Sequence, residues 1–260
     1  MKRAYIELPE GQMHYRSAGT GEEYIILLHM SGSSSDEYEG VGDLLAERGY
    51  HVFAPDLLAF GSSDFPPRFY SMQDHIRTVL AFMDAVGAGT SYFYGNMATA
   101  NMIGHIGAEH PDRVKGLMMG HPLYHPDPDY FRQRRHMPGF AKIDLQADGG
   151  HLMEMWRRAI KYGDPPEIAD QRCYCLHRAG AWGETLHWAL HEDTPLCEYL
   201  DKIGPRTVII AYSFFGDPAM LRDVVKTMPN GSFDFYEGTP YIARADPKCV
   251  ADMICKHFPV

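Results

Sequence analysis

Two histidines follow apolar runs of the sequence, and imidazole is the side chain best suited to move protons near neutral pH. His29 follows the run at residues 24–28, and His121 follows the run at residues 114–120. If each run is a buried strand, either ring could act as a general acid or base at its end. A histidine that precedes a proline, as His121 does, also fits a hydrogen-bonded structural role. The sequence therefore offers two candidate proton carriers and leaves a structural role open for both.

A third chemical feature is the stretch Tyr-Phe-Tyr-Gly-Asn-Met-Ala-Thr-Ala-Asn at residues 92–101. An aromatic run ends at Gly95, small residues follow, and apolar residues from Met102 onward repeat at helical spacing. This pattern predicts a strand, a sharp turn and a helix. It resembles the nucleophile elbow of the α/β-hydrolase family, in which G-x-S-x-G holds a serine at the tip of the turn. Here Gly95 matches the first glycine, Met97 takes the place of the serine, and Thr99 replaces the second glycine.

The loop His-Met-Ser-Gly-Ser-Ser-Ser at residues 29–35 lies where the family carries one half of its oxyanion hole. The resemblance implies that the amide of Ser31, with Met30 as the weaker choice, acts together with the amide of Ala98. Two such donors can stabilise negative charge on an oxygen without any reactive side chain. A serine- and glycine-rich loop that only turns the chain is the alternative interpretation.

The resemblance also locates the catalytic acid and base, and both differ from the family pattern. Asp217 is the only carboxylate in the loop at residues 213–218, which follows the strand at residues 206–212, but it comes a residue or two late. The base histidine is expected at position 240, seven residues before Pro247, where this chain has Pro240. A methionine and a proline cannot form the acyl-enzyme chemistry of a serine, histidine and aspartate triad. The predicted catalytic residues are therefore His29, His121 and Asp217, and the predicted substrate-binding residues are Met30, Ser31, Asn96, Met97, Ala98, Trp156, Pro240 and Tyr241.

Hydrophobic patterning gives the elements that must position these residues. Residues 3–8 and 12–18 alternate apolar and polar side chains around a turn, which predicts a hairpin at a sheet edge. Short apolar strands then alternate with helical patterns up to residue 120, which favours a parallel sheet with helices on both faces. The sequence thus predicts an α/β-hydrolase fold with a core at residues 1–122 and 204–260. Residues 123–203 are expected to form a helical lid between strands 6 and 7.

Several residues of the predicted lid have spacings that metal ligands can use. Cys173 and His177, His187 and His191, and the pair His121 and His125 are each four positions apart. No third and fourth ligand is fixed by the sequence, and satisfied surface histidines are the favoured interpretation. No phosphate loop is found, so neither a metal nor a cofactor is expected.

Composition restricts the remaining possibilities. The 260-residue chain is 45% hydrophobic, with 24 Lys and Arg against 34 Asp and Glu, a formal net charge of −10. Such a chain can bury a large core, and its negative charge disfavours nucleic acid and anionic membranes as partners. An odd number of cysteines and the lack of an apolar leader or membrane span favour a cytoplasmic protein with reduced thiols. The expected partner is a small-molecule substrate, and a homodimer stays open.

These observations lead to three hypotheses. The first is an enzyme that uses the retained oxyanion hole and its histidines for a non-hydrolytic lyase, cyclase or isomerase reaction. Its substrate would be a small, largely apolar carbonyl compound. The second is an inactive ligand-binding or scaffolding protein in which Met97 fills a former active site. The third is an esterase-type hydrolase with an unrecognised nucleophile.

Overall fold

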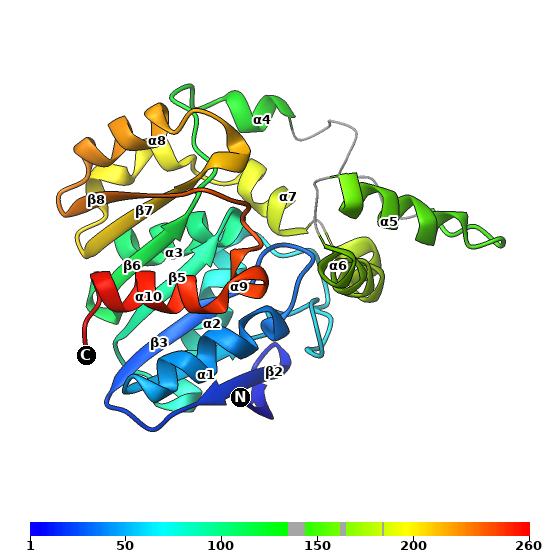
Figure 1. The fold of residues 1–260 in the computed structure, drawn as a ribbon, viewed down its shortest axis with the longest axis horizontal. Helices are drawn as coiled ribbons and strands as arrows, with labels where there is room; N and C mark the ends of the chain where they lie inside the picture. The colour runs from blue at the N-terminus through cyan, green and yellow to red at the C-terminus, as the bar shows by residue number, and fades with distance from the viewer. Residues whose placement is uncertain (135–143, 162–164, 184) are drawn as a thin grey trace.

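The computed structural model describes residues 1–134, 144–161, 165–183 and 185–260. Within them an eight-stranded sheet runs in the order β1-β2-β4-β3-β5-β6-β7-β8 (Figure 1). The strands are β1 Lys2–Leu8, β2 Gly11–Ala18, β3 Glu23–Leu28, β4 Tyr50–Pro55, β5 Ser91–Asn96, β6 Val114–Gly120, β7 Arg206–Tyr212 and β8 Gly231–Tyr236. The predicted fold class, an α/β-hydrolase fold with a mostly parallel sheet, is confirmed.

The sheet is antiparallel at one edge and parallel elsewhere. β1 pairs with β2 as a hairpin closed between Leu8 and Gly11, and β2 pairs antiparallel with β4. All pairings from β4 through β3, β5, β6 and β7 to β8 are parallel. The carboxyl ends of the parallel strands therefore lie at one edge of the sheet, where open α/β sheets place their binding sites.

Continuous apolar strands supply both faces of the sheet, because successive side chains of a strand point to opposite sides. In β3, Ile25 and Leu27 belong to one buried cluster and Ile26 and Leu28 belong to the other. Helices α1, α9 and α10 pack in the first cluster, and α2, α3, α7 and α8 pack in the second. The helices are α1 Glu39–Glu47, α2 Met72–Val86, α3 Ala98–Glu109, α4 Tyr130–Arg134, α5 Gly150–Lys161, α6 Pro166–Ala179, α7 Thr185–Glu192, α8 Ala219–Val224, α9 Ile242–Ala245 and α10 Pro247–His257.

Short 3-10 helices connect several of these elements. They are η1 Ser35–Tyr38, η2 Pro111–Arg113, η3 Gly180–Trp182, η4 Leu196–Glu198, η5 Leu200–Lys202, η6 Ser213–Phe215 and η7 Val225–Thr227. None of the helices in the described part of the chain is both long and apolar enough to cross a lipid bilayer.

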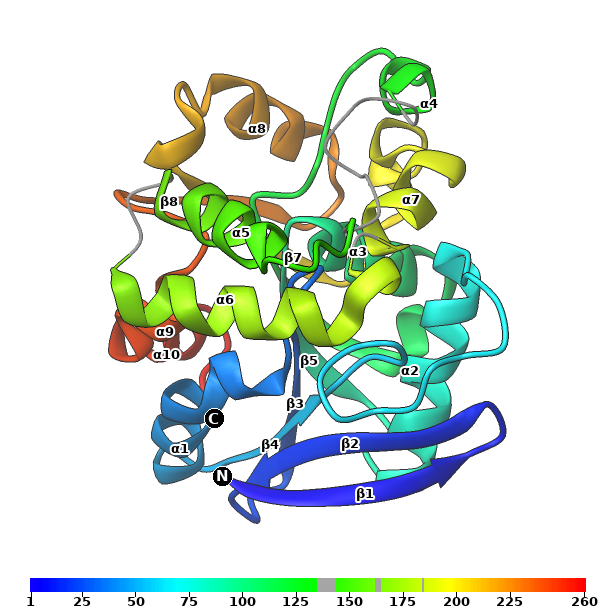
Figure 2. The ribbon, with the colours of Figure 1, turned by 90° about the vertical axis from the view of Figure 1, so that its right-hand side faces the viewer.

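The segment between β6 and β7 is helical, as the sequence predicted, and comprises α4 to α7 with η3, η4 and η5. Helices α5 and α6 lie side by side, and α5 extends away from the sheet (Figures 1 and 2). Residues 135–143, 162–164 and 184 of the predicted lid lie outside the described residues. The function of this segment as a lid stays a prediction.

Candidate functional site

The turn between β5 and α3 has the backbone of a nucleophile elbow. Met97 has φ 56° and ψ −120°, and its amide donates to the carbonyl oxygen of Gly120 on β6 at 2.8 Å. A bulky residue with positive φ is strained, at a cost of about 1–3 kcal/mol. The side chain of Met97 is partly exposed at the end of the sheet. The sharp turn predicted from the sequence is therefore present, with a thioether at its tip.

Small and polar residues hold this turn closed. A Cβ on Gly95 would lie 2.9 Å from the carbonyl oxygen of Thr99, which explains the glycine. The Thr99 hydroxyl accepts from the amide of Asn96 at 3.1 Å and lies 3.2 Å from the carbonyl oxygen of Leu28. Threonine at this position thus links the turn to β3.

Beneath the turn lies a buried, uncharged hydrogen-bond network. The Tyr212 hydroxyl donates to Asn96 Oδ1 at 2.5 Å, and Asn96 Nδ2 donates to the Tyr94 hydroxyl at 3.0 Å. Burial raises the pKa of Tyr94 to about 12 and holds the pKa of Tyr212 well above its usual value. Gly120 permits this arrangement, since its Cβ would lie 1.6 Å from Asn96 Oδ1. Asn96, predicted to bind substrate, has its amide engaged by two tyrosines instead.

His121 follows β6 beside this network and also has positive φ, at 42°. The amide of Tyr212 donates to its Nδ1 at 3.3 Å, and its ring lies 4.1 Å from that of Phe215. Burial lowers the pKa of His121 to about 4, so the ring is neutral near pH 7. Because Nδ1 accepts a hydrogen bond, the proton of the neutral ring is on Nε2. His121 therefore presents an N–H donor.

His29 is held differently from His121. Its ring is fully buried, Nδ1 donates to the carbonyl oxygen of Met30 at 2.8 Å, and Nε2 accepts from the amide of Leu57 at 3.0 Å. Both nitrogens are thus used by the backbone, and they join the end of β3 to the loop after β4. This geometry fits the structural role that the sequence left open.

Met30 and Ser31, in the loop after β3, have different contacts. The Met30 amide is directed to Glu37 Oε1 at 3.4 Å, whereas the Ser31 hydroxyl donates to the carbonyl oxygen of Gly183 at 2.9 Å. Burial raises the pKa of Glu37, against the opposing effect of Arg244. Ala98 is the first residue of α3, where amides have no acceptor within the helix. The amides of Ser31 and Ala98 are accordingly the candidate oxyanion donors.

The predicted site residues on the last two loops have other contacts. Asp217 is exposed, and its Oδ1 accepts from the amide of Ala219 at the start of α8. Pro240 is buried, and the ring of Tyr241 lies 4.1 Å from the guanidinium of Arg172 on α6. No hydrogen bond in the described part of the chain joins Asp217 to His121. The role of Asp217 as the catalytic acid stays a prediction.

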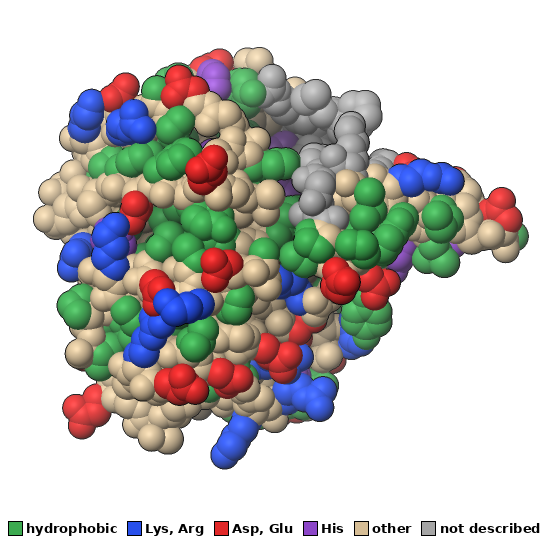
Figure 3. Space-filling view, in the orientation of Figure 1, with side chains coloured by type: hydrophobic (Ala, Val, Ile, Leu, Met, Phe, Trp, Pro, Cys, Tyr) green, Lys and Arg blue, Asp and Glu red, His purple; other side chains and the backbone are tan. Residues whose placement is uncertain are grey.

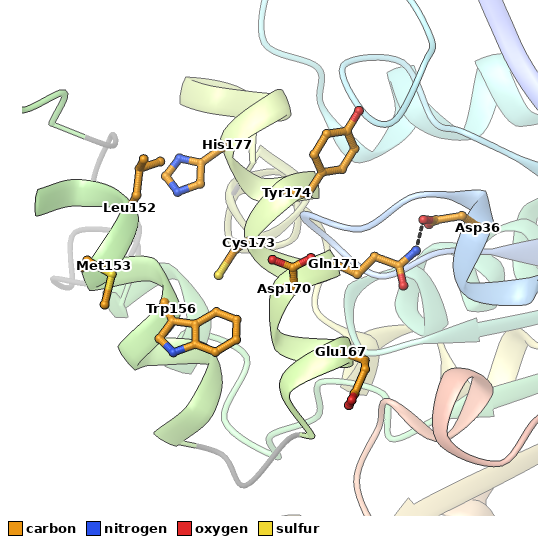
Figure 4. Close-up of a pocket in the computed structure, with 10 residues that line it drawn as sticks. All are labelled: Asp36, Leu152, Met153, Trp156, Glu167, Asp170, Gln171, Cys173, Tyr174 and His177. Carbon is orange, nitrogen blue, oxygen red and sulfur yellow. Dashed lines mark hydrogen bonds between the residues drawn. The ribbon is translucent and has the colours of Figure 1, made fainter. Parts of the chain in front are cut away.

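Trp156 lines a groove that none of the other predicted substrate-binding residues lines. This open groove of about 750 Å³ lies between α5 and α6 and does not include Met97 in its lining. Figure 4 shows Trp156 on α5 and Cys173 and His177 on α6 at this groove. The exposed apolar side chains Leu152 and Met153 of α5 line it. Hydrophobic side chains gather on the projecting α5 arm in Figure 3. Among the described residues, no three His, Cys, Asp or Glu side chains gather as a metal site.

Comparison with known proteins supports what this geometry indicates. A sequence model for the alpha/beta hydrolase fold matches residues 23–166, more than half of the chain. The chain belongs to the α/β-hydrolase family.

Curated relatives of this α/β-hydrolase match parts of the chain. A haloalkane dehalogenase of Bradyrhizobium diazoefficiens is 32% identical over 106 residues, which cover 40% of this chain and 34% of the relative. An AB hydrolase superfamily protein of Gibberella zeae is 30% identical over 114 residues, 43% of this chain and 40% of the relative. Bifunctional epoxide hydrolase 2 of Mus musculus is 26% identical over 180 residues, 61% of this chain and 32% of the relative. The matched stretches thus span well under half of each relative.

Solved structures match along nearly the whole chain. The enol-lactonase from Burkholderia xenovorans LB400 has a TM-score of 0.77 at 14% identity, covering 99% of this chain and 100% of that one. The thermophilic esterase from Thermogutta terrifontis has a TM-score of 0.80 at 18% identity, covering 98% and 97%. At such identities the likeness shows the fold alone.

Sequence reasoning missed three buried residues that shape the site. Glu37 contacts the oxyanion loop, and Tyr94 and Tyr212 hold Asn96 beneath the turn. Each looks like an ordinary residue of its helix or strand, and the partner of Tyr212 lies 116 positions away in the sequence. Only the aromatic run before Gly95 offered a partial signal, since it placed Tyr94 next to the turn.

Proposed function

We propose that this chain is an enzyme that polarises a carbonyl oxygen without a covalent acyl intermediate. The observation that carries the proposal is Met97, which lies at the tip of the elbow in the conformation that presents a nucleophile in the family. A thioether cannot serve as the nucleophile of acyl transfer. Met97 occupies the position of the family's nucleophile, and Pro240 occupies the position of its base. We interpret the pair as a triad that has lost both residues. Lyase, cyclase and isomerase reactions, in which negative charge develops on a carbonyl oxygen, suit such a site.

Three N–H groups would stabilise that charge. The amides of Ser31 and Ala98 supply two, and Nε2–H of His121 supplies the third. A neutral imidazole is a suitable donor, because a cationic one would give up its proton to a developing enolate. Donors of this kind contribute about 2.7–4 kcal/mol each where mutagenesis has measured them. The substrate class is a small, largely apolar carbonyl compound.

An oxyanion mimic tests this proposal before any substrate is known. We expect 4-nitrophenol to bind as its phenolate, which absorbance detects as a red shift of the bound dye. His121→Gln should weaken phenolate binding by about tenfold, since one hydrogen bond to a charged group is altered. The control is His110→Gln, at the opposite end of α3 and roughly 18 Å from the elbow. Binding of the neutral phenol, or equal affinity in both variants, would contradict the proposal.

Two other functions give different results in further assays. A hydrolase with an unrecognised nucleophile would turn over p-nitrophenyl esters and be labelled by a fluorophosphonate, whereas we expect neither. Ser31, one such candidate, has its hydroxyl engaged with Gly183. An inactive ligand-binding protein, in which Met97 fills a former active site, is the other alternative. It would bind carbonyl compounds without preference for the oxyanion mimic.

A further inference from the structure

A second cavity lies beside the loop after β3, away from the elbow. Its volume is about 170 Å³, and its lining includes Arg3 and Arg16 of the β1–β2 hairpin, Ser35 of η1 and Arg178 of α6. Asp36 and Asp56 also line it, whereas Met97 and His121 do not. At roughly 30 Å³ per water molecule, this space holds about five waters or one small ion with fewer.

Two buried donors of this cavity lack an acceptor. Arg16 Nε and Ser35 Oγ are buried and have no hydrogen-bond partner among the described residues. Ser35 is 1% exposed, and its amide is fixed by Asp56 Oδ1 at 2.6 Å. Buried polar groups are normally satisfied, so two unused donors in one lining indicate an acceptor that binds there.

The charges around the cavity favour an anion as that acceptor. Arg16 pairs with Glu39 at 2.6 Å, whereas no carboxylate of the described chain pairs with the exposed Arg3 and Arg178. Arg3 on β1 and Arg178 on α6 thus carry positive charges that have no carboxylate partner among the described residues.

The two aspartates of the lining are already engaged. Asp56 accepts from His14 Nδ1 at 2.8 Å, from the Ser35 amide, and from the Ser62 amide at 2.7 Å. Asp36 pairs with Arg244 at 2.8 Å and also accepts from Gln171 and Ser34. Both carboxylates therefore already have donors within the protein, whereas Arg3 and Arg178 have no carboxylate partner among the described residues.

We propose that this cavity binds a phosphate group, either inorganic phosphate or that of a small phosphomonoester. A tetrahedral oxyanion offers enough acceptors for guanidinium groups arriving from two elements and for the Ser35 hydroxyl. It would join the β1–β2 hairpin and loop 29–35 to α6, which lies above the hairpin in Figure 2. The inference is independent of the chemistry proposed for the elbow.

Calorimetric titration of the whole chain with inorganic phosphate, in a phosphate-free buffer of low ionic strength, tests the site. We expect saturable binding at millimolar concentration or below. Arg178→Gln and Arg3→Gln should each weaken it by about tenfold, because each removes a charge-assisted contact. Ser35→Ala should weaken it less and leave the fold intact, since the deleted hydroxyl has no partner. Arg132→Gln, at an exposed arginine of α4 outside the cavity, is the matched control.

Glycerol phosphate distinguishes the two sources of the group. Binding at least tenfold tighter than inorganic phosphate would identify a phosphomonoester, and equal affinity would identify the free ion. Circular dichroism of each variant verifies that it is folded. The proposal is overturned if the wild-type chain shows no saturable heat. It is also overturned if Arg3→Gln and Arg178→Gln, both folded, bind phosphate as the wild type does.

Discussion

The turn after β5 and the loop after β3 lie at the same edge of the sheet, yet different forces hold them. The turn rests on Tyr94, Asn96 and Tyr212, which are neutral, fully buried and hydrogen-bonded to one another. The loop rests on carboxylates: Asp56 accepts from the Ser35 amide, and Glu37 contacts the Met30 amide. One part of the candidate oxyanion hole is thus supported without charge, and the other is supported by buried charge.

The two candidate histidines differ in a similar way, because one lies beside the neutral network and the other beside the loop held by carboxyl groups. His121 beside the neutral network keeps one nitrogen available, whereas His29 beside the charged loop has both nitrogens bonded to the backbone. The comparison teaches that the elbow conformation does not require a nucleophile. Gly95, Thr99 and the Met97 amide help to hold it, whereas the loop of the opposite donor is held by the carboxyl groups of Asp56 and Glu37.

The largest effect is expected from removing the charge that supports the loop. Asp56→Ala deletes a 2%-exposed carboxylate and leaves His14 and two backbone amides without their acceptor. Each buried donor left without an acceptor costs about 1–3 kcal/mol, so three of them amount to about 3 kcal/mol or more. Urea denaturation should show a loss of this size in the free energy of unfolding. A loss under about 1 kcal/mol, the size typical of a single hydrogen bond, would contradict the importance of buried charge here.

Acid should destabilise the charged loop before it affects the neutral turn. Burial alone would raise the pKa of Asp56, but His14 and the Ser62 and Ser35 amides lower it from 3.8 to about 2. A depressed carboxyl pKa stabilises the fold above the unfolded value, and that contribution is lost as pH falls from about 4 to 2. The shift corresponds to about 2 kcal/mol. Urea midpoints across this pH range measure it, with Asp56→Asn as the control whose slope should be shallower.

The structural features that depend on residues close together in the sequence could be predicted from it. Alternation at residues 3–8 and 12–18 gave the hairpin, continuous apolar runs gave the parallel strands, and the aromatic run ending at Gly95 gave the turn of Met97. These features depend on neighbours a few positions apart. Local sequence therefore determined the fold class and the elbow.

What the sequence left open depends on distant partners. His29 has a structural geometry because the amide of Leu57, 28 positions away, donates to it. Trp156 was grouped with Met97, but the packing of α5 against α6 places it in a separate groove. The register of Asp217 depends on η6, which turns the chain before α8 and leaves the carboxylate exposed. No local pattern reports such contacts.

A smaller effect is expected from the neutral network. Tyr212→Phe removes the hydroxyl that donates to Asn96 Oδ1 at 2.5 Å and leaves that buried oxygen with one partner fewer. An unsatisfied buried acceptor costs about 1–3 kcal/mol, so the loss in unfolding free energy should be smaller than for Asp56→Ala. Tyr236→Phe, on the neighbouring strand and less buried, is the control and should change stability little. If Tyr212→Phe costs more than Asp56→Ala, the ranking of the two regions is reversed.

The smallest effect separates backbone strain from side-chain packing at Met97. Met97→Ala and Met97→Gly both remove the thioether, and they differ only in the Cβ that makes φ 56° unfavourable. We expect Met97→Gly to be more stable than Met97→Ala by about 1 kcal/mol, because glycine adopts positive φ without steric cost. Inside α3 the order should reverse, so Ala100→Gly should lose about 1 kcal/mol relative to wild type. Both differences can be read from urea midpoints at one pH. Equal stability of the two Met97 variants would mean that the elbow relaxes once the methionine is gone, and that its conformation belongs to the side chain rather than to the fold.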